Sequence, residues 1–314
     1  MKPPPAQPPE IGAAWLAAMR AGDWEQAWRE TDRIEQPRRE RQRGSDFERH
    51  PHELIWDGTP FDGRVVRIRC LHGLGDTLQF LRFVPLVAER AHALHFLVQP
   101  ALIPLLQGLP GLGEVSTAWT DDPPPAHVEI EVMELAYALR ATASSLPPPY
   151  PHLAQRARAL CRMVLPEAGR PQRIGLLWAA SDWDPSRSIP LEALEPLLSM
   201  PGLRFYSFQQ GRAAEDPHVP AMGITPLSRH TGSIECAASA LLDMDQVVAV
   251  DGMPAHLAAT LGIRTWLLLK HEADWRWGSG DTTPWYPGMR LVRQEKAGNW
   301  KGVVGSLVTA LRTG

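Results

Sequence analysis

Apolar residues follow two spacings along most of the chain, and each spacing predicts one kind of element. Residues 64–70 form a short apolar run with Val65, Val66 and Ile68, which is typical of a buried strand. Such runs are followed by apolar residues at helical spacing, and this alternation favours a parallel sheet covered by helices. The first set comprises strands at 64–70, 93–98, 114–117 and 127–132, with helices beginning at Thr77, Pro100 and Met133.

A proline-rich stretch at residues 146–151 interrupts this alternation and predicts a domain boundary. A second alternating set begins at Arg173. Two such halves predict an α/β protein with two Rossmann-like domains facing a cleft, where ligand pockets are common. The second set comprises strands at 173–178, 204–208, 246–250 and 264–269, with helices at 191–199, 233–242, 254–261 and 300–311.

The N-terminal region has a different pattern. Residues 11–33 show helical spacing on both sides of Ala21-Gly22-Asp23, which predicts a helix, a turn and a second helix. Residues 36–49 are rich in Arg and Glu, and we interpret them as a solvated helix or linker. The expected division is a disordered Pro-rich tail (1–10), a helical segment (11–50), a first Rossmann-like domain (51–150), a linker (151–172) and a second Rossmann-like domain with a terminal helix (173–314).

Composition restricts the class of protein. A chain of 314 residues with 44% hydrophobic and 21% charged residues can form two compact domains. The net charge of -3 gives no global basic field, so neither nucleic acid nor an anionic membrane is the implied partner. No apolar run reaches the length of about 18 residues that a transmembrane helix needs, and the N-terminus does not resemble a signal peptide. We therefore expect a cytoplasmic protein.

Three cysteines, Cys70, Cys161 and Cys236, are far apart in sequence and include no C-x-x-C pair. This spacing indicates neither a disulfide framework nor a zinc knuckle, and we interpret them as core thiols in a reducing compartment. The histidine pairs at positions 50 and 52 and at 92 and 95 have no third ligand nearby. No metal and no cofactor is therefore expected.

One strand-to-helix junction, at residues 70–80, places Asp76 directly after Gly73 and Gly75. Glycines permit a ligand to approach the main chain, and the first N–H groups of the helix favour an anion or polar ligand. Leu78 stands where the dinucleotide fingerprint has its third glycine, so a dinucleotide site is disfavoured. A purely structural alternative is that Asp76 is the helix N-cap.

A second junction, at residues 248–257, places Asp251 and Gly252 between a strand and a helix that carries His256. The two acids, one in each half, are expected to face one cleft. Asp251 has its own alternative as an N-cap, and His256 has one as a buried packing residue.

With these two junctions, the sequence resembles the GT-B glycosyltransferases of the heptosyltransferase-like class, especially bacterial proteins in which this domain follows tetratricopeptide repeats. The resemblance extends from about Gly22 to the C-terminus, and residues 73–80 with Arg82 to Pro85 are the strongest match. Residues 22–28 resemble a degenerate last repeat, and residues 56–58 resemble the entry to the sheet. Further matches are residues 175–179, 187–190, Gln209 with Gly211, Asp251 with His256, residues 274–277 and residues 284–287.

The resemblance implies transfer of a sugar from a nucleotide-sugar donor to an acceptor hydroxyl, with the nucleotide held mainly by the C-terminal domain. It implies that Asp76 is the general base, which takes the proton of the acceptor hydroxyl. The implied acceptor is a saccharide, a lipid-saccharide or a protein. The candidate acceptor or backbone contacts are Gly73, Gly75, Thr77 and Gln79, and the candidate donor contacts are Arg187, Ser188, Gln209, Asp251, Gly252, His256 and Lys270.

A leaving diphosphate develops negative charge, which backbone N–H groups, a helix N-terminus and cations can stabilise without a metal. Arg187 and Lys270 are the candidate cations. Their structural alternatives are an ion pair of Arg187 with Asp184 or Glu192 and a solvated strand end at Lys270. Aromatic residues near the C-terminus are candidates for ligand stacking, but we interpret them as a packed cluster: Trp275, Trp277, Trp285 and Tyr286.

One departure from the family pattern concerns the donor site. The family usually has Thr and then a small residue after the acid, whereas this chain has Gly252-Met253-Pro254, which removes a hydroxyl and one N–H. This departure supports an alternative function, a non-catalytic scaffold that binds protein partners through residues 11–50. A third function that such a cleft would fit is that of a nucleotide-sugar epimerase.

Overall fold

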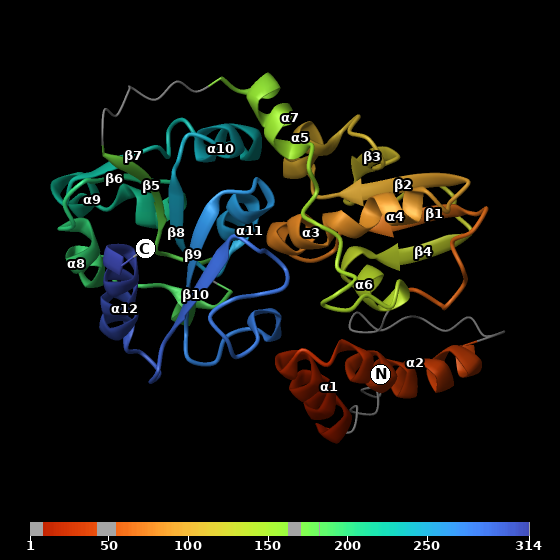
Figure 1. The fold of residues 1–314 in the computed structure, drawn as a ribbon. Helices are drawn as coiled ribbons and strands as arrows, with labels where there is room; N and C mark the ends of the chain where they lie inside the picture. Colours follow the sequence, from red (N-terminus) through yellow and green to blue (C-terminus); the bar gives the residue numbers. More distant parts are fainter. Residues whose placement is uncertain (1–8, 43–54, 163–170, 182, 314) are drawn as a thin grey trace.

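The computed structural model describes residues 9–42, 55–162, 171–181 and 183–313. Within these residues the strands form two parallel sheets, shown in Figure 1 with helices packed against them. Of the sequence predictions, the tail at 1–8, residues 43–54 with His50 and His52, and linker residues 163–170 lie outside the described residues.

The first half is built on a sheet with the strand order β3-β2-β1-β4. All its strands were predicted from the apolar runs. Its elements, with η denoting a 3-10 helix, are β1 (Val65–Arg69), α3 (Leu74–Phe80), η1 (Leu81–Phe83), α4 (Val84–Ala88), β2 (Ala93–Val98), η2 (Pro100–Leu102), α5 (Ile103–Leu106), β3 (Glu114–Thr117), β4 (Val128–Glu131), η3 (Val132–Glu134) and α6 (Leu135–Ala138).

The second half is built on a sheet with the strand order β10-β9-β8-β5-β6-β7. The sequence predicted its central strands and missed β7 and β10, which lie at the two edges. Its elements are β5 (Gln172–Leu177), η4 (Pro185–Arg187), η5 (Leu191–Leu194), α8 (Glu195–Leu198), β6 (Leu203–Ser207), η6 (Gly211–Glu215), α9 (His218–Ala221), β7 (Ile224–Pro226), α10 (Ile234–Leu241), β8 (Gln246–Val250), α11 (Met253–Thr260), β9 (Arg264–Leu269), η7 (Trp275–Trp277), β10 (Met289–Arg293) and α12 (Trp300–Thr313).

Both sheets reverse their strand order at one position. Numbered from its own first strand, the second sheet reads 3-2-1-4-5-6 and the first reads 3-2-1-4, which is the doubly wound arrangement. In such sheets a ligand crevice lies at the carboxyl ends of the strands beside the reversal. The reversals lie between β1 and β4 and between β5 and β8, and the helices that follow β1 and β8, α3 and α11, pack against each other (Figure 1).

Two N-terminal helices, α1 (Pro9–Ala21) and α2 (Trp24–Gln42), form the predicted pair joined by a turn, and Gly22 lies in this turn at φ +77°. They contact both halves. The Trp28 indole Nε1 donates to the Ala141 carbonyl, at 2.6 Å, and the ring of Trp24 packs against that of Trp285, with centroids 4.9 Å apart.

The prediction that residues 36–49 are solvated is wrong at Arg38. This side chain is buried and forms an ion pair with Glu35. The neighbouring Arg39 guanidinium lies over the ring of Trp56, 4.8 Å from its centroid. The charges of this segment therefore include pairs inside the structure as well as a solvated face.

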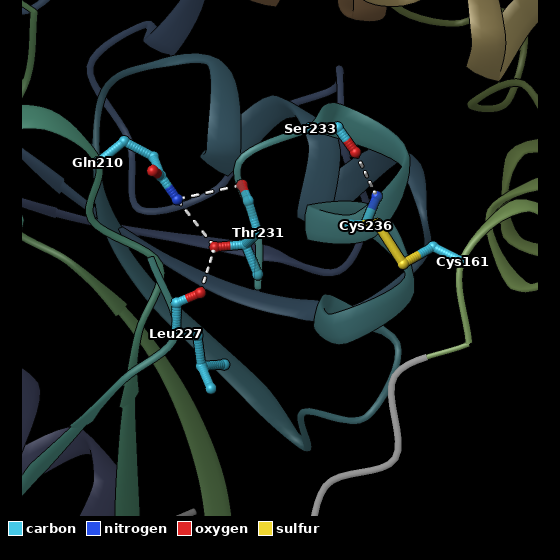
Figure 2. Close-up of a disulfide and its surroundings, with 6 residues drawn as sticks. All are labelled: Cys161, Gln210, Leu227, Thr231, Ser233 and Cys236. Atoms are coloured by element: carbon cyan, nitrogen blue, oxygen red, sulfur yellow. Dashed lines mark hydrogen bonds between the residues drawn. A yellow bond between two sulfur atoms is a disulfide. The ribbon is translucent and has the colours of Figure 1, made fainter. Parts of the chain in front are cut away.

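A disulfide joins Cys161 to Cys236, which corrects the prediction that these two are free core thiols. Cys161 directly follows α7 (Leu153–Leu160), which packs against α5 of the first half and α10 of the second. Figure 2 shows the bond where the chain leaves α7 and meets the first turn of α10. The 75-residue separation carried no information about distance, because helix packing brings the two Cα atoms to 5.1 Å. Cys70 is free and buried, as predicted.

Candidate functional site

A cavity of about 910 Å³ lies between the two halves, at the carboxyl ends of the strands beside both reversals. The loop after β1 and the first turn of α3 contribute residues 72–76, and η3 after β4 contributes Met133. The second half contributes residues of the segments 177–187, 250–256 and 268–276. The two strand-acid-helix junctions of the sequence, which carry Asp76 and Asp251, therefore line one cleft as predicted.

Asp76 lies in the first turn of α3. Gly73, in extended conformation at ψ 157°, is the N-cap of this helix, so the interpretation of Asp76 as the N-cap is wrong. The Asp76 carboxylate accepts the Gly73 N–H through Oδ2, at 3.0 Å, and a hydrogen bond from Arg276 Nη2 through Oδ1, at 2.6 Å. Each carboxylate oxygen is thus held by one donor at the edge of the cleft.

Arg276 belongs to η7 in the second half, and from the sequence it was noted only as part of the match at residues 274–277, with no role. Its Nε donates to Gln79 Oε1, at 3.0 Å, and its Nη1 to Asp274 Oδ1, at 2.8 Å. Burial by itself lowers the pKa of the Arg276 guanidinium, but the charges of Asp274 and Asp76 outweigh it and raise this pKa. Arg276 and Asp76 are 200 positions apart in sequence, so nothing local indicated that they meet.

The other residues predicted around Asp76 divide into two groups. Gly73 and Gly75 line the cleft. Thr77 and Gln79 do not line it, because their side chains are fully buried. Thr77 Oγ1 donates to Gln99 Oε1, at 3.0 Å, and Gln79 accepts from Arg276, so both support the turn from behind.

Gly75 has a function that the sequence analysis did not foresee. A Cβ at this position would lie 2.8 Å from His256 Cδ2 and 3.4 Å from the Cα of Met253. The missing side chain therefore permits the close crossing of α3 and α11.

Three charged side chains form a cluster on the second-half wall of the cleft. Lys270 Nζ donates to Asp184 Oδ2, at 2.6 Å, and to Ser186 Oγ, at 3.2 Å. Arg187 lies 3.8 Å from the Asp184 carboxylate and donates through Nη1 to the Asp251 carbonyl, at 3.1 Å. The hydrogen bonds that Asp184 accepts from Lys270 and then from Ser186 hold the pKa of this carboxyl below its usual value. The predicted cations are therefore together, and the alternative ion pair of Arg187 with Asp184 is also present.

Ser188 and Gln209 position the loop after β5 rather than facing the cleft. The Gln209 Oε1 accepts the N–H groups of Trp178 and Ala179, and its Nε2 donates to the Ala179 carbonyl. Ser188 Oγ accepts the Ala180 N–H, at 3.0 Å. Their polar groups are thus directed at the backbone of this loop.

His256 is buried and Asp251 is half-buried beside the aromatic segment. Asp251 Oδ2 accepts from the Trp277 indole, at 2.9 Å, and burial raises the pKa of this carboxyl. The N-cap of α11 is Gly252, so the N-cap interpretation of Asp251 is wrong. His256 Nδ1 lies 3.0 Å from the Tyr286 hydroxyl, and burial lowers the pKa of His256 to about 3. His256 is therefore neutral at physiological pH.

The first turn of α11 contains the departure noted in the sequence. Gly252 and Met253 have N–H groups at this helix end, where the backbone has no intrahelical acceptor to offer them. Pro254, the second residue of the helix, has no N–H, and the N–H of Ala255 donates back to the Gly252 carbonyl. Two N–H groups therefore remain for an anion.

The aromatic segment is packed, as interpreted from the sequence. Trp277, Trp285 and Tyr286 are almost fully buried, and Trp275 packs against Trp15 of α1, with ring centroids 5.2 Å apart. An aromatic residue that the sequence analysis missed does reach the cleft. Trp183 lines it with 84% of its surface exposed.

Among the described residues, no group of three or more His, Cys, Asp and Glu side chains is arranged to hold a metal ion. None of the described helices is long and apolar enough to cross a membrane.

Comparison with known proteins relates this architecture to a fold. No protein-family model matches the chain. The chain is 24% identical over 285 residues to protein FlbA of Caulobacter vibrioides, and the match covers 82% of this chain and 48% of FlbA. The chain therefore spans about half the length of the curated relative it matches.

Solved glycosyltransferase structures superpose on most of the chain. A glycosyltransferase family 9 protein from Veillonella parvula matches with a TM-score of 0.58 and 12% identity, over 81% of this chain and 98% of that one. Heptosyltransferase WaaC of E. coli, solved with ADP, matches with a TM-score of 0.52 and 15% identity, over 79% of this chain and 98% of WaaC. These similarities establish the GT-B fold that the sequence predicted.

Proposed function

We propose that this protein is a glycosyltransferase that transfers a sugar from a nucleotide-sugar donor to an acceptor hydroxyl, without a metal. The observation that carries the proposal is the position of Asp76. Its carboxylate is fixed at the edge of a large cleft, opposite a cation cluster on the other half. The GT-B fold, shared with a glycosyltransferase family 9 structure and with heptosyltransferase WaaC solved with ADP, supports this class of reaction.

The proposed reaction is one displacement at the anomeric carbon of the donor sugar. Asp76 takes the proton of the acceptor hydroxyl while its oxygen forms the new bond to that carbon. The bond from the carbon to the diphosphate breaks, and its electron pair leaves with the nucleoside diphosphate. A saccharide, a lipid-saccharide or a protein hydroxyl fits this step equally well.

The second half supplies the groups proposed to hold the diphosphate. Lys270 and Arg187 stand together at the cleft, and the N–H groups of Gly252 and Met253 lie at the first turn of α11. A cation and a helix N-terminus both stabilise the charge that develops on a leaving phosphate. We propose that Ser188 and Gln209 act behind these groups by fixing their loop, whereas Asp251 and His256 line the cleft beside them.

The first experiment is calorimetric titration with ADP, UDP, GDP, CDP and dTDP and their common sugar conjugates. We expect one preferred nucleotide, with weaker binding in Lys270→Ala. Asp76→Asn should retain this binding and the fold, but lose transfer by roughly 10²- to 10⁴-fold, because it removes the proton acceptor. Full transfer activity in Asp76→Asn would exclude Asp76 as the base.

A second function, a non-catalytic scaffold, is favoured by two observations. Lys270 and Arg187 both face Asp184, and Pro254 removes an N–H from the helix end. Diphosphate would therefore have to compete with a carboxylate. If a folded protein binds none of the nucleotides or their conjugates, the scaffold becomes the better account.

A further inference from the structure

A single arginine connects the proposed base to the opposite half of the molecule. Arg276 lies in η7, on the loop that follows β9, whereas Asp76 lies on α3 after β1. Their ion pair, at 2.6 Å between Nη2 and Oδ1, crosses the boundary between the two halves. The side that supplies the proposed donor contacts thus also touches the proposed base.

The Arg276 guanidinium is held in three directions at once. Its Nη2, Nε and Nη1 donate to Asp76, Gln79 and Asp274 respectively. A planar guanidinium has donors at these three nitrogens, whereas the ammonium of lysine is a point charge on a flexible stem. The geometry therefore requires arginine rather than a positive charge alone.

Aromatic contacts fix the same guanidinium from its faces. It lies 4.7 Å from the ring centroid of Trp275 and 6.0 Å from that of Phe80. Trp275 in turn packs against Trp15 of α1. With 10% of its side chain exposed, Arg276 has little freedom to move toward a phosphate in the cleft.

The Asp76 carboxylate depends on Arg276 for one of its two fixed oxygens. The Gly73 N–H holds Oδ2, and rotation about this one hydrogen bond is prevented by the bond from Arg276 to Oδ1. A misplacement of a catalytic group by about 1 Å is enough to reduce the rate of reaction by about 10²-fold.

We propose that Arg276 is a positioning residue that orients the Asp76 carboxylate toward the acceptor hydroxyl from across the boundary between the halves. This inference rests on the proposed function and adds a residue that acts through Asp76. The Asp76 carboxylate is then correctly oriented when the loop after β9 packs against α3.

The test compares Arg276→Gln, Arg276→Lys and Arg276→Ala with Arg82→Lys as a matched control. Arg82 is also a buried arginine at this boundary, where it lies 5.1 Å from the ring centroid of Tyr286, and it makes no contact with Asp76. The assay follows release of nucleoside diphosphate from the nucleotide-sugar selected by calorimetry, with water as the acceptor.

We expect Arg276→Gln to lower kcat by about 10²-fold while KM changes by less than about threefold, since the donor contacts stay intact. Guanidinium ion at a non-denaturing concentration should restore part of the lost kcat to Arg276→Ala and none to Arg82→Lys. Arg276→Lys should fall between Arg276→Gln and the native protein. Equal losses in the Arg276 and Arg82 variants, with no rescue, would overturn the proposal and leave Arg276 as a structural residue.

A crystal structure of Arg276→Gln gives a readout that does not require turnover. We expect the Asp76 carboxylate to leave the Gly73 N–H or to adopt more than one conformation. An Asp76 side chain in the same place as in the native protein would overturn the proposal. Failure of the proposed function itself appears differently, as full activity in Asp76→Asn or as native protein that binds no nucleotide.

Discussion

The positively charged side chains of the cleft already face carboxylates, and this lowers the binding free energy that an anionic ligand can gain there. Lys270 and Arg187 face Asp184, and Arg276 faces Asp76. An anionic ligand must therefore share or displace a carboxylate before it gains a cation, which costs part of its binding free energy. Contacts that carry no charge then matter more for affinity.

Trp183 is such an uncharged contact, and we predict that it stacks on the nucleobase or on a sugar ring. Most tryptophans are largely buried, whereas Trp183 is 84% exposed, and its ring centroid lies 5.3 Å from the Arg187 guanidinium. Trp183→Ala should weaken nucleotide binding by about 1–3 kcal/mol, roughly 5- to 150-fold in Kd, because stacking on an aromatic ring is worth this much.

Calorimetry with the preferred nucleotide measures this effect, and Trp119→Ala is the matched control. Trp119 is 74% exposed and does not line the cleft, so its removal should leave Kd unchanged. Trp183→Phe should keep most of the affinity. Equal affinities of Trp183→Ala and the native protein would exclude stacking at this residue.

His256 allows a prediction about pH. Its pKa is lowered by burial to about 3 in the folded protein, from 6.5 in the unfolded chain. Below pH 6.5 the unfolded chain binds a proton that the folded protein does not, so the stability present above pH 6.5 is lost as the pH falls toward 3. The slope from this one group approaches about 1.4 kcal/mol per pH unit.

Urea unfolding of the native protein and of His256→Gln at a series of pH values below 6.5 checks this prediction. The free energy of unfolding of the variant should fall less steeply on acidification, because one proton uptake has been removed. His230→Gln, which changes an exposed histidine, should follow the native curve. Parallel curves for the native protein and His256→Gln would contradict the prediction.

Single residues were predictable from sequence where their chemistry and their neighbours in the chain coincide. Asp76 and Asp251 follow strands and precede helices, so their place at the cleft was readable. Arg276 and Trp183 were not, since their importance comes from partners or exposure that local sequence does not encode. Gln79 was predicted to contact the acceptor, but its side chain is buried in the interior, and its position along the helix did not show this.

At the scale of elements, the site depends on how two short helices cross. α3 and α11 follow the strands beside the two reversals, and their first turns meet at the cleft. Of the two strands before them, β8 is a continuous apolar run, as a parallel strand covered on both faces is, whereas β1 alternates buried apolar residues with Arg67 and Arg69. The edge strands were not predicted: β7 has only three residues, and β10 carries Arg290 and Arg293.

Gly75 is predicted to be essential for this crossing. Gly75→Ala would bring a Cβ to 2.8 Å from His256 Cδ2 and force the helices apart, which we expect to cost about 1–3 kcal/mol of unfolding free energy. Gly305→Ala in α12 is the control, because a Cβ there meets nothing within 4 Å. In an open helical position the same substitution gains about 0.5–1 kcal/mol.

Thermal or urea unfolding of the two variants distinguishes the effects by sign. A lower stability for Gly75→Ala together with a higher one for Gly305→Ala supports the close crossing of α3 and α11. A gain of stability in both variants would show that the helices have room for a methyl group.

For the whole molecule, the N-terminal helices tie the two halves together. One apolar cluster runs from α1 and α2 through the first half to the inner helices of the second. The sequence predicted these helices as a pair and a possible partner surface, but their inward contacts depend on residues more than 100 positions away. Local periodicity shows that a helix has an apolar face, and not which element covers it.

Trp24 provides a test of whether α1 and α2 are integral to the molecule. It is almost fully buried, and it contacts Trp28 on its own helix and Trp285 of the second half. Phe80 of the first half packs on the same Trp285 ring, with centroids 5.3 Å apart. Trp24→Ala should therefore lower the unfolding free energy by about 3–5 kcal/mol, the usual cost of removing a buried aromatic side chain.

Hydrogen exchange shows which segments of the chain lose stability in Trp24→Ala. If the helices act as a tie, Trp24→Ala should speed amide exchange in α3 and in the segment around Trp285 as well as in α2, because all three share the packed rings. Glu25→Ala, the adjacent exposed residue of α2, should leave both distant segments unchanged. Faster exchange confined to residues 9–42 would instead describe an independent module, and would favour a partner-binding use of these helices over their use as a support for the loop that carries Arg276.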